Sequence, residues 1–302
     1  MTLVSPPDRA TSFGMPRRGV LPSTWRFLRR WPVIPGVIVF VLIICAIFAQ
    51  VIAPHDPLRG DLFSSGLPPV WASNGSFEYL LGTDILGRDV LSRVIHGARI
   101  SMIIAAVVLA TGGIFGTALG MFAGYQGGQV DEILMRIVDF TLAVPFILIA
   151  LVIVIVFGQS FVVLIVLLSV FGWGAFARQV RAETLSLRTR DYVLQARIVG
   201  ASTMLILIKH ILPGVTNTIV VIATLRVGQL ILTESILSYL GAGIPPPTPA
   251  WGLMVAQGRS FIAVEWWITF FPGMAIFLTV FAMNFLGDWL RDYFDPRLRQ
   301  TV

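Results

Sequence analysis

The chain has 302 residues, of which 56% are hydrophobic and only 13% are charged. A soluble domain carries about 25% charged residues, so this composition excludes an ordinary water-soluble globular protein. The formal net charge is +6 at pH 7, but the basic residues form no patch interleaved with aromatic side chains, and nucleic-acid binding is not expected.

Six nearly uncharged apolar runs follow one another along the chain, and most reach the roughly 20 residues that a helix needs to cross the hydrocarbon core. Strand-like alternation is absent, so helices are expected to satisfy the backbone hydrogen bonds. The fourth run is short, and the fifth contains Arg226 and Glu234. The sequence predicts an all-α membrane protein with six transmembrane helices, at residues 33–53, 100–124, 137–157, 161–177, 219–240 and 266–286.

The basic residues predict the orientation of these helices. Six arginines precede the first run, and sixteen of the 22 basic residues fall on the same side as that N-terminal segment. Because cytoplasmic segments are enriched in Lys and Arg, residues 1–32 and 289–302 are expected to be cytoplasmic tails. A long polar lead and no prompt cleavage site favour an uncleaved first helix over a signal peptide. Residues 54–97 then lie outside, and the long polar loop at 178–212 lies inside.

The second apolar run carries a glycine every four residues. Glycines at this spacing form a smooth stripe on which another helix can approach closely, which favours a role in helix packing. A pore-lining role is the alternative. The stripe consists of Gly112, Gly116, Gly120 and Gly124.

The third run has two local features near its inner boundary and its centre. Arg136 and Asp139 are three residues apart on one helical face, which predicts a local ion pair, with a proton relay as the weaker alternative. Pro145 is expected to kink the helix.

The inside loop has the pattern of two short helices joined by a glycine. Asp191 is expected to cap the first helix, Gly200 to permit a sharp turn, and Ser202 or Thr203 to cap the second. Pro213 is expected to break or restart the path into the fifth transmembrane helix. Such an element suits docking by a partner protein, and an ordinary amphipathic surface helix fits the pattern equally well.

Arg226 and Glu234 stand within the fifth predicted helix, where ionisable groups are costly and tend to face protein or water. At about 100° per residue the two lie within roughly 80° of each other, so both are candidates for the translocation pathway. The alternatives are a structural pair with a partner subunit, or a Glu234 near the outer interface.

The sequence lacks the residues that an ATPase or another enzyme requires. Its single lysine, Lys209, follows Ile208 and cannot belong to a phosphate-binding loop ending in Gly-Lys-Ser/Thr. Three dispersed histidines and one cysteine make no metal-ligand cluster. A non-catalytic protein without cofactor or metal is predicted.

The inside loop carries the first family resemblance. The segment DYVLQARIVGAS at 191–202, followed by Pro213, resembles the cytoplasmic "EAA" loop of ATP-binding-cassette (ABC) importer permeases, whose coupling helix sits in a groove of the ATPase. Leu194 and Gln195 stand where that family usually has Glu and Ala, which removes a carboxylate from the expected contact. The resemblance implies that the ATPase-coupling residues are Asp191, Tyr192, Leu194, Gln195, Ala196, Gly200, Ala201 and Pro213.

Further motifs narrow the family. LGTDILGRDVLSR at 81–93, GARIS at 97–101, LSYLGAG at 237–243, PPTP at 246–249 with the following Trp-Gly, LGDWLRD at 286–292 and DPR at 295–297 resemble the dipeptide, oligopeptide and nickel permeases. They point to the second, C-type subunit of the permease pair. The resemblance implies a type I permease core at 98–288, in which helices two to six are shared and helix one is added.

The resemblance also implies a function and partners. The chain would form half of a translocation pathway for dipeptides or oligopeptides in the inner (plasma) membrane of a prokaryote, working by alternating access. Its partners would be a second homologous permease, two cytoplasmic ATPase subunits, an extracytoplasmic substrate-binding protein and membrane lipid. The same role for nickel or another small solute is the alternative. A secondary transporter would need an internal repeat and mid-membrane carboxylates, of which only Glu234 is a candidate, and a scaffold or receptor would not need the docking loop.

Overall fold

The computed structural model describes residues 32–294. The predicted tail at 1–32 therefore lies almost wholly outside the described residues, as do the end of the tail at 289–302 and the DPR motif. Within the described range the regular structure is helical, apart from one isolated bridge between Thr83 and Asp89. The helices are α2 (Val33–Ile52), η1 (Leu62–Ser64), α3 (Val90–Gln126), α4 (Gly128–Ala143), α5 (Phe146–Phe157), α6 (Phe161–Leu187), α7 (Asp191–Ile198), α8 (Thr203–Ile206), η2 (Leu207–Ile211), α9 (Leu212–Tyr239), α10 (Trp251–Gly258), η3 (Arg259–Phe261) and α11 (Trp267–Phe294).

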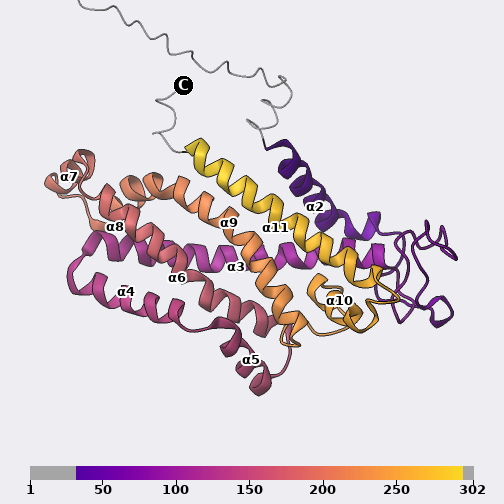
Figure 1. The fold of residues 1–302 in the computed structure, drawn as a ribbon. Coiled ribbons are helices and arrows are strands. Elements are labelled where there is room, and N and C mark those ends of the chain that lie inside the picture. The colour runs from indigo at the N-terminus through magenta and orange to yellow at the C-terminus, as the bar shows by residue number, and fades with distance from the viewer. Residues whose placement is uncertain (1–31, 295–302) are drawn as a thin grey trace, which may run out of the picture.

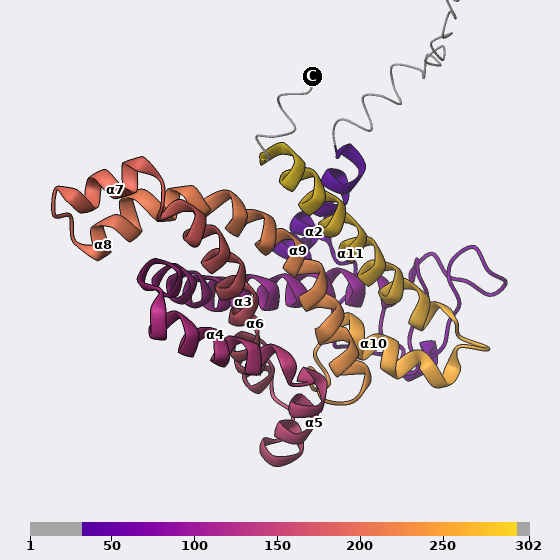
Figure 2. The ribbon, with the colours of Figure 1, turned by 60° about the vertical axis from the view of Figure 1, so that its left-hand side comes forward.

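The long helices form an elongated bundle with loops gathered at its two ends. Figures 1 and 2 show α7 and α8 at one end, and α10 with the loops before α3 at the other. Five helical segments are long and apolar enough to cross a membrane, and α4 with α5 makes a sixth if the pair counts as one span. These observations confirm the predicted all-helical membrane fold.

The third predicted span bends at Pro145 as expected, and it is interrupted there rather than continuous. Helices α4 and α5 meet at an angle of 77°. Val144 is extended, with φ −77° and ψ 130°, because the ring of the following proline disfavours helical geometry at the residue before it. The proline also lacks an N–H, so the α4 hydrogen-bond ladder ends here.

Helices α3 and α6 extend by ten or more residues beyond the apolar runs that predict them. Helix α3 begins at Val90, where the Asp89 side chain accepts a hydrogen bond from the Ser92 amide at 2.9 Å and caps the helix. Helix α6 continues to Leu187, so the inside loop predicted from residue 178 starts ten residues later. Its extra turns carry charges that pair with α4, since Arg178 and Arg181 form ion pairs with Asp139 and Asp131.

The ion pair predicted between Arg136 and Asp139 is therefore wrong. Arg136 pairs with Glu132 one turn earlier at 2.5 Å, while Asp139 pairs with Arg178 of α6. The cause is the packing of α4 on α6, which brings a basic side chain from another helix to Asp139.

The glycine stripe of α3 lies directly against α6. A Cβ atom built on Gly116 would lie 2.3 Å from the carbonyl oxygen of Trp173, and one on Gly120 would lie 2.5 Å from that of Ala177. Gly124 approaches the Arg181 carbonyl in the same way, and Gly112 the Trp173 amide. The two backbones thus approach as closely as the absence of side chains allows.

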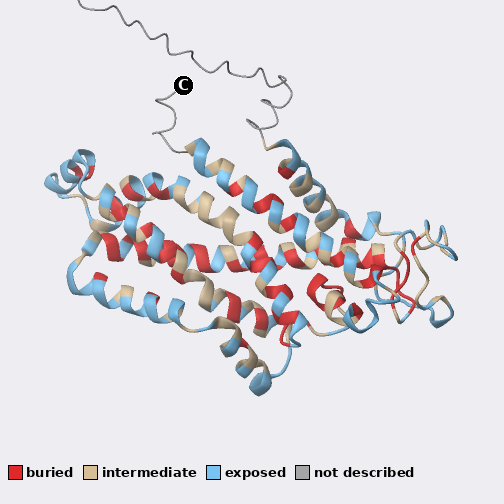
Figure 3. Ribbon diagram, in the orientation of Figure 1, coloured by how far each residue is buried: buried red, intermediate tan, exposed pale blue. Residues whose placement is uncertain are grey.

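Buried residues concentrate along α3, α6, α9 and α10, whereas the outward faces of α2, α4, α5 and α11 are exposed (Figure 3). The exposed faces are strongly apolar. Phe40, Phe140, Ile155 and Phe277 are each more than half exposed. Large apolar surfaces of this kind require lipid or another protein as their environment.

Candidate functional site

The loop between α6 and α9 forms a separate unit at one end of the bundle (Figure 2). Helix α7 starts at Asp191, whose side chain makes no capping bond, and Arg190 occupies the cap position, so the predicted capping role of Asp191 is wrong. Gly200 has a φ of +79°, which L-residues rarely adopt, and it turns the chain as expected. Ser202 caps α8 by accepting a hydrogen bond from the Leu205 amide at 3.4 Å. Pro213 lies in the first turn of α9, where a missing N–H costs nothing, so the helical path continues through it.

Helix α7 has one buried face and one exposed face. Val193 and Ala196 pack into a cluster with Ile206, Ile211 and Val215, which fixes the helix on the start of α9. The opposite face is open, and Ile198 and Val199 are 84% and 83% exposed. Of the remaining predicted coupling residues, Asp191, Tyr192, Leu194, Gln195 and Gly200 are exposed and Ala201 is half-buried. Leu194 thus presents an apolar group at the position where the resembled family has a carboxylate.

The helix that precedes this loop is tied to its neighbours by arginines. Arg188 donates a hydrogen bond to the carbonyl oxygen of Gly124 at 2.9 Å, near the end of α3. About two and three turns earlier, Arg181 pairs with Asp131 and Arg178 pairs with Asp139. These contacts join α6 to the end of α3 and to two turns of α4. The apolar-run analysis missed these pairs because it placed both arginines in the loop.

A cavity of ≈ 170 Å³ opens at the break between α4 and α5, against α6 and α9. Arg226, Gln229 and Thr233 line it from one face of α9, and Thr141 and Val144 line it from α4 and the break. Arg226 is half-buried and makes no hydrogen bond or ion pair with any residue in the range 32–294. Gln229 and Thr141 were not singled out in the sequence, although the spacing of residues 226, 229 and 233 is that of one helical face.

Glu234 does not line this cavity, so the two predicted pathway residues are not brought together. Its side chain is 1% exposed and accepts a hydrogen bond from the Ser238 hydroxyl at 2.6 Å. The adjacent Ser235 packs closely on Gly252 of α10, where a Cβ would lie 2.5 Å from the serine Cα. Glu234 is thus enclosed where α9 meets α10.

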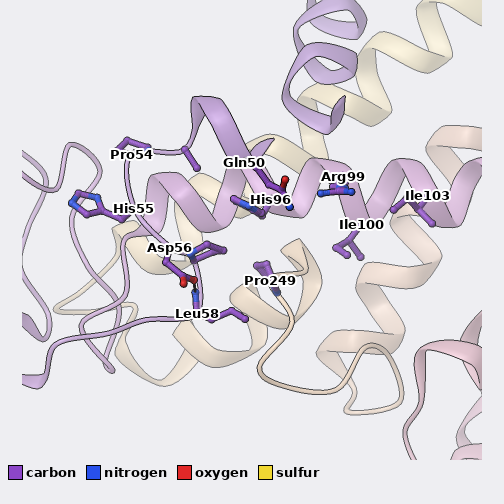
Figure 4. A pocket seen from close by; sticks show the side chains of 12 residues that line it. Gln50, Pro54, His55, Asp56, Leu58, His96, Arg99, Ile100, Ile103 and Pro249 are labelled. Carbon is purple, nitrogen blue, oxygen red and sulfur yellow. Dashed lines mark hydrogen bonds between the residues drawn. The ribbon is translucent and has the colours of Figure 1, made fainter. Parts of the chain in front are cut away.

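A second, larger cavity of ≈ 760 Å³ lies at the end of the bundle opposite α7. It is bounded by the end of α2 and the following turn, by the first turns of α3, and by Pro249 of the proline-rich loop. Figure 4 shows Gln50 on α2, His96 and Arg99 on α3, and Pro249 on the proline-rich loop, all lining this cavity. His96 and Arg99 stand three residues apart on one helical face, which was the available sequence signal.

The motif at 81–93 folds into a buried ionic cluster beside this cavity. Asp84 receives hydrogen bonds from Arg88 at 2.8 Å and from Arg93, and Arg93 also donates to the Gln257 amide oxygen of α10 at 3.1 Å. Trp267 donates to the Thr83 carbonyl oxygen at 3.0 Å. The cluster fixes the segment before α3 onto α10 and α11, so the two loop regions at this end form one surface.

Comparison with known proteins gives a consistent result. Residues 116–300 match the family described as binding-protein-dependent transport system inner membrane component. The di/tripeptide transport system permease protein DppC of Pseudomonas aeruginosa is 39% identical over 271 residues, which are 88% of this chain and 89% of that protein. The glutathione transport system permease proteins GsiD of Pectobacterium atrosepticum and Escherichia coli O157:H7 are each 41% identical over 278 residues, covering 91% of this chain and 90% of theirs.

These matches cover nearly the whole length of the chain and its relatives. Permeases of this family are multi-pass proteins of the inner membrane, are generally non-catalytic, and work with partner ATPases and substrate-binding proteins. The helical membrane bundle described above is the fold that such a role requires. The chain therefore belongs to the inner membrane components of binding-protein-dependent transport systems and is a permease subunit of an ABC importer.

Proposed function

We propose that this permease carries short peptides and forms half of the translocation pathway in a heterodimer with a second, homologous permease. The observation that carries the proposal is the substrate named for its relatives. Permeases about 40% identical over about 90% of the chain are named for di/tripeptides and for glutathione, and both are short peptides.

The proposed orientation places α7 in the cytoplasm and α10 outside, with both termini cytoplasmic. The charge distribution supports it. The end near α7 carries Arg178, Arg188, Arg190, Arg197 and Lys209, as expected of cytoplasmic segments. The apolar outer faces of α2 and α11 would then contact lipid, and the permease core would span residues 98–288.

Helix α7 is the proposed docking element for one ATPase. Its inner face is packed on α9 and its outer face exposes Leu194, Ile198 and Val199, which suits burial in a groove of a partner. ATP-driven closure of two ATPases would move α7, and the arginine contacts at Arg188 and Arg181 would carry that movement into α3 and α4. The docked partner shifts the equilibrium between inward-facing and outward-facing states only if its contacts differ between them.

The loops at the opposite end are the proposed docking surface for the substrate-binding protein. The segments 54–97 and 241–264 meet there and share the ionic cluster around Asp84. The cavity lined by His96, Arg99 and Pro249 opens between them. A loaded binding protein seated on both segments would deliver its substrate at the outer mouth of the bundle.

Two measurements test the proposal. Replacing Ile198 and Val199 with Glu removes the apolar face of α7 without touching its packed face. We expect the partner permease still to co-purify and the ATPases to be lost. The matched control is Leu62→Glu/Phe63→Glu, which places two carboxylates on exposed apolar positions of the loop region at the opposite end of the bundle and leaves the α7 face intact. Retained ATPases and uptake in the α7 variant would contradict the coupling role.

The substrate is tested separately, in proteoliposomes that contain the complete importer and its loaded binding protein. Labelled trialanine and glutathione are expected to accumulate in an ATP-dependent manner. Uptake of a nickel chelate with no uptake of either peptide would overturn the peptide assignment while leaving the permease role in place.

A further inference from the structure

Arg226 is a charged side chain in the middle of a membrane helix, and it has no hydrogen-bond or ion-pair partner among the residues that the structure describes. It lies half-way along α9. Charged groups at such positions are expensive and face protein, water or a functional partner. Glu234 differs from Arg226 in this respect, since its carboxylate accepts a hydrogen bond from the Ser238 hydroxyl. The Arg226 guanidinium is therefore available to a ligand that enters the bundle.

The cavity that Arg226 lines offers hydrogen-bond donors and no acidic side chain. Gln229 lies one turn along the same face of α9, and its amide group has no partner among the described residues. The Thr141 hydroxyl donates to the Ile137 carbonyl oxygen at 2.8 Å, and the Thr233 hydroxyl donates to the Gln229 carbonyl oxygen at 2.8 Å. Neither hydroxyl therefore has a proton left to donate to a ligand. The free donors are those of the Arg226 guanidinium and the Gln229 amide. This donor set selects an anionic oxygen ligand.

The backbone around the cavity is also unusual for a membrane span. Helix α4 ends at Ala143, and Val144 and Pro145 are extended before α5 begins. Non-helical backbone at membrane depth is tolerated where it is covered by protein or lines a water-filled cavity. Val144 and Phe146 line the same cavity as Arg226, so the break provides the space that the guanidinium faces.

We propose that the cavity formed by Arg226, Gln229 and the α4–α5 break binds the C-terminal carboxylate of a peptide in transit. This inference rests on the proposed peptide transport. A planar guanidinium forms paired hydrogen bonds with a carboxylate, and these are stronger than bonds between neutral groups. The carboxylate is common to free peptides whatever their side chains, so one site at this position serves substrates of different sequence. The three leucines and two phenylalanines that line the cavity offer no polar contact by which the side chains of a peptide could be selected.

A carboxylate of the partner permease is the competing ligand for Arg226, and the experiment separates the two. Proteoliposomes with the complete importer are supplied with binding protein fully loaded either with trialanine or with trialanine amide, which lacks the anionic end. The wild type is expected to transport the acid at least about tenfold faster than the amide, as loss of a charge-assisted contact implies. The R226Q variant should transport the acid at the rate of the amide, and the amide at its wild-type rate.

Three further variants sharpen the result. R226K keeps the positive charge but loses the planar guanidinium that forms paired hydrogen bonds, so it should retain an intermediate preference for the acid over the amide. Gln229→Leu should reduce the preference in part. Arg136→Gln, on the exposed face of α4 and outside the cavity, should leave it unchanged. Co-purification of the partner permease shows that each variant assembles.

Equal loss of acid and amide transport in R226Q, or loss of the permease partner, would assign Arg226 to a structural pair and overturn the inference. An unchanged acid preference in R226Q would overturn it as well. If the wild type transports neither peptide, the proposed peptide function itself fails, and that outcome is distinct from both.

Discussion

Arg181 of α6 holds Asp131 of α4 in a two-pronged contact, with its Nε 2.9 Å and its Nη2 2.5 Å from the two carboxylate oxygens. The side chains are 33% and 12% exposed, so the pair is partly shielded from water. The contact joins two helices at the α7 end of the bundle, and the chain connects these helices only through α5 at the opposite end. It therefore fixes α4 relative to the helix that leads into α7.

Removal of one partner is the first test of this contact. Asp131→Ala leaves a half-buried guanidinium without its carboxylate, and we expect a loss of about 1–2 kcal/mol in the free energy of unfolding, between the values for exposed and buried pairs. The melting temperature of the purified permease pair should fall by a few degrees. Glu132→Ala is the matched control, because the Glu132–Arg136 pair on the same helix is largely exposed.

The charge-reversed double variant Asp131→Arg/Arg181→Asp separates pairing from other effects. If the ion pair is what matters, the double variant should recover part of the melting temperature lost by each single variant. A double variant less stable than either single one would show that the two side chains act independently.

The glycine stripe is the part of the packing that the sequence predicted best, because a four-residue spacing specifies a helical face without reference to any neighbour. The neighbour itself is not encoded locally. Asp139 illustrates this limit, since Arg136 at three residues' distance was the available local partner and Arg178 of α6 is the actual one. Pro145 predicted an interruption of the helix near Val144. It did not predict the angle of 77° between α4 and α5, because that angle depends on how α5 packs against α6 and α9.

In the candidate sites too, features set by the local sequence were predicted and features set by neighbouring helices were not. Gly200 and the turn after α7 follow from glycine's access to positive φ, and they were predicted. The separation of Arg226 from Glu234 was not predicted. The two residues lie about 80° apart around an ideal helix, and this angle alone does not show which of them faces the cavity and which faces α10. The change of face falls between residues 233 and 234. Thr233 still lines the cavity, whereas Glu234 is buried on the side of α10.

Adding a methyl group to the stripe should disrupt the contact between α3 and α6. In Gly116→Ala the new Cβ would lie 2.3 Å from the Trp173 carbonyl oxygen and 2.8 Å from the Phe176 Cβ, so both helices must separate. We expect a loss of about 1–3 kcal/mol, as for overpacked cores. Gly273→Ala is the control, since nothing lies within 4 Å of its Cβ position. Equal melting temperatures for the two variants would contradict the close approach.

The ionic cluster at the α10 end of the bundle should depend most on its single carboxylate, Asp84. Asp84→Ala leaves Arg88 and Arg93, which are 5% and 1% exposed, without their acidic partner. Breaking a buried pair in this way costs about 3–5 kcal/mol. Asp56→Ala removes an exposed pair with Arg59 and should cost about 0–1 kcal/mol. Thermal unfolding of the two variants side by side tests the difference.

Glu265 predicts a pH dependence at the same end. Burial raises the pKa of its carboxyl above the model-peptide value of 4.5, and the nearby charge of Asp84 raises it further. A folded-state pKa above the unfolded one means that the folded chain binds the proton more tightly, so stability declines as the pH rises from 4.5 through the raised pKa. Glu265→Gln should flatten the melting temperature across that range. A slope identical to that of the wild type would exclude Glu265 as its source.

Gly200 provides a test of the docking loop that does not depend on steric space. Its φ is +79°, and a Cβ there would meet nothing within 4 Å, so any penalty on substitution comes from the backbone. Asn tolerates this conformation, whereas a β-branched residue does not, and the difference is about 1–2 kcal/mol. Gly200→Val should therefore misplace α7 and lower peptide uptake several-fold at unchanged ATPase content, while Gly200→Asn retains most of the uptake. Equal uptake in the two variants would mean that the turn at Gly200 does not set the position of α7.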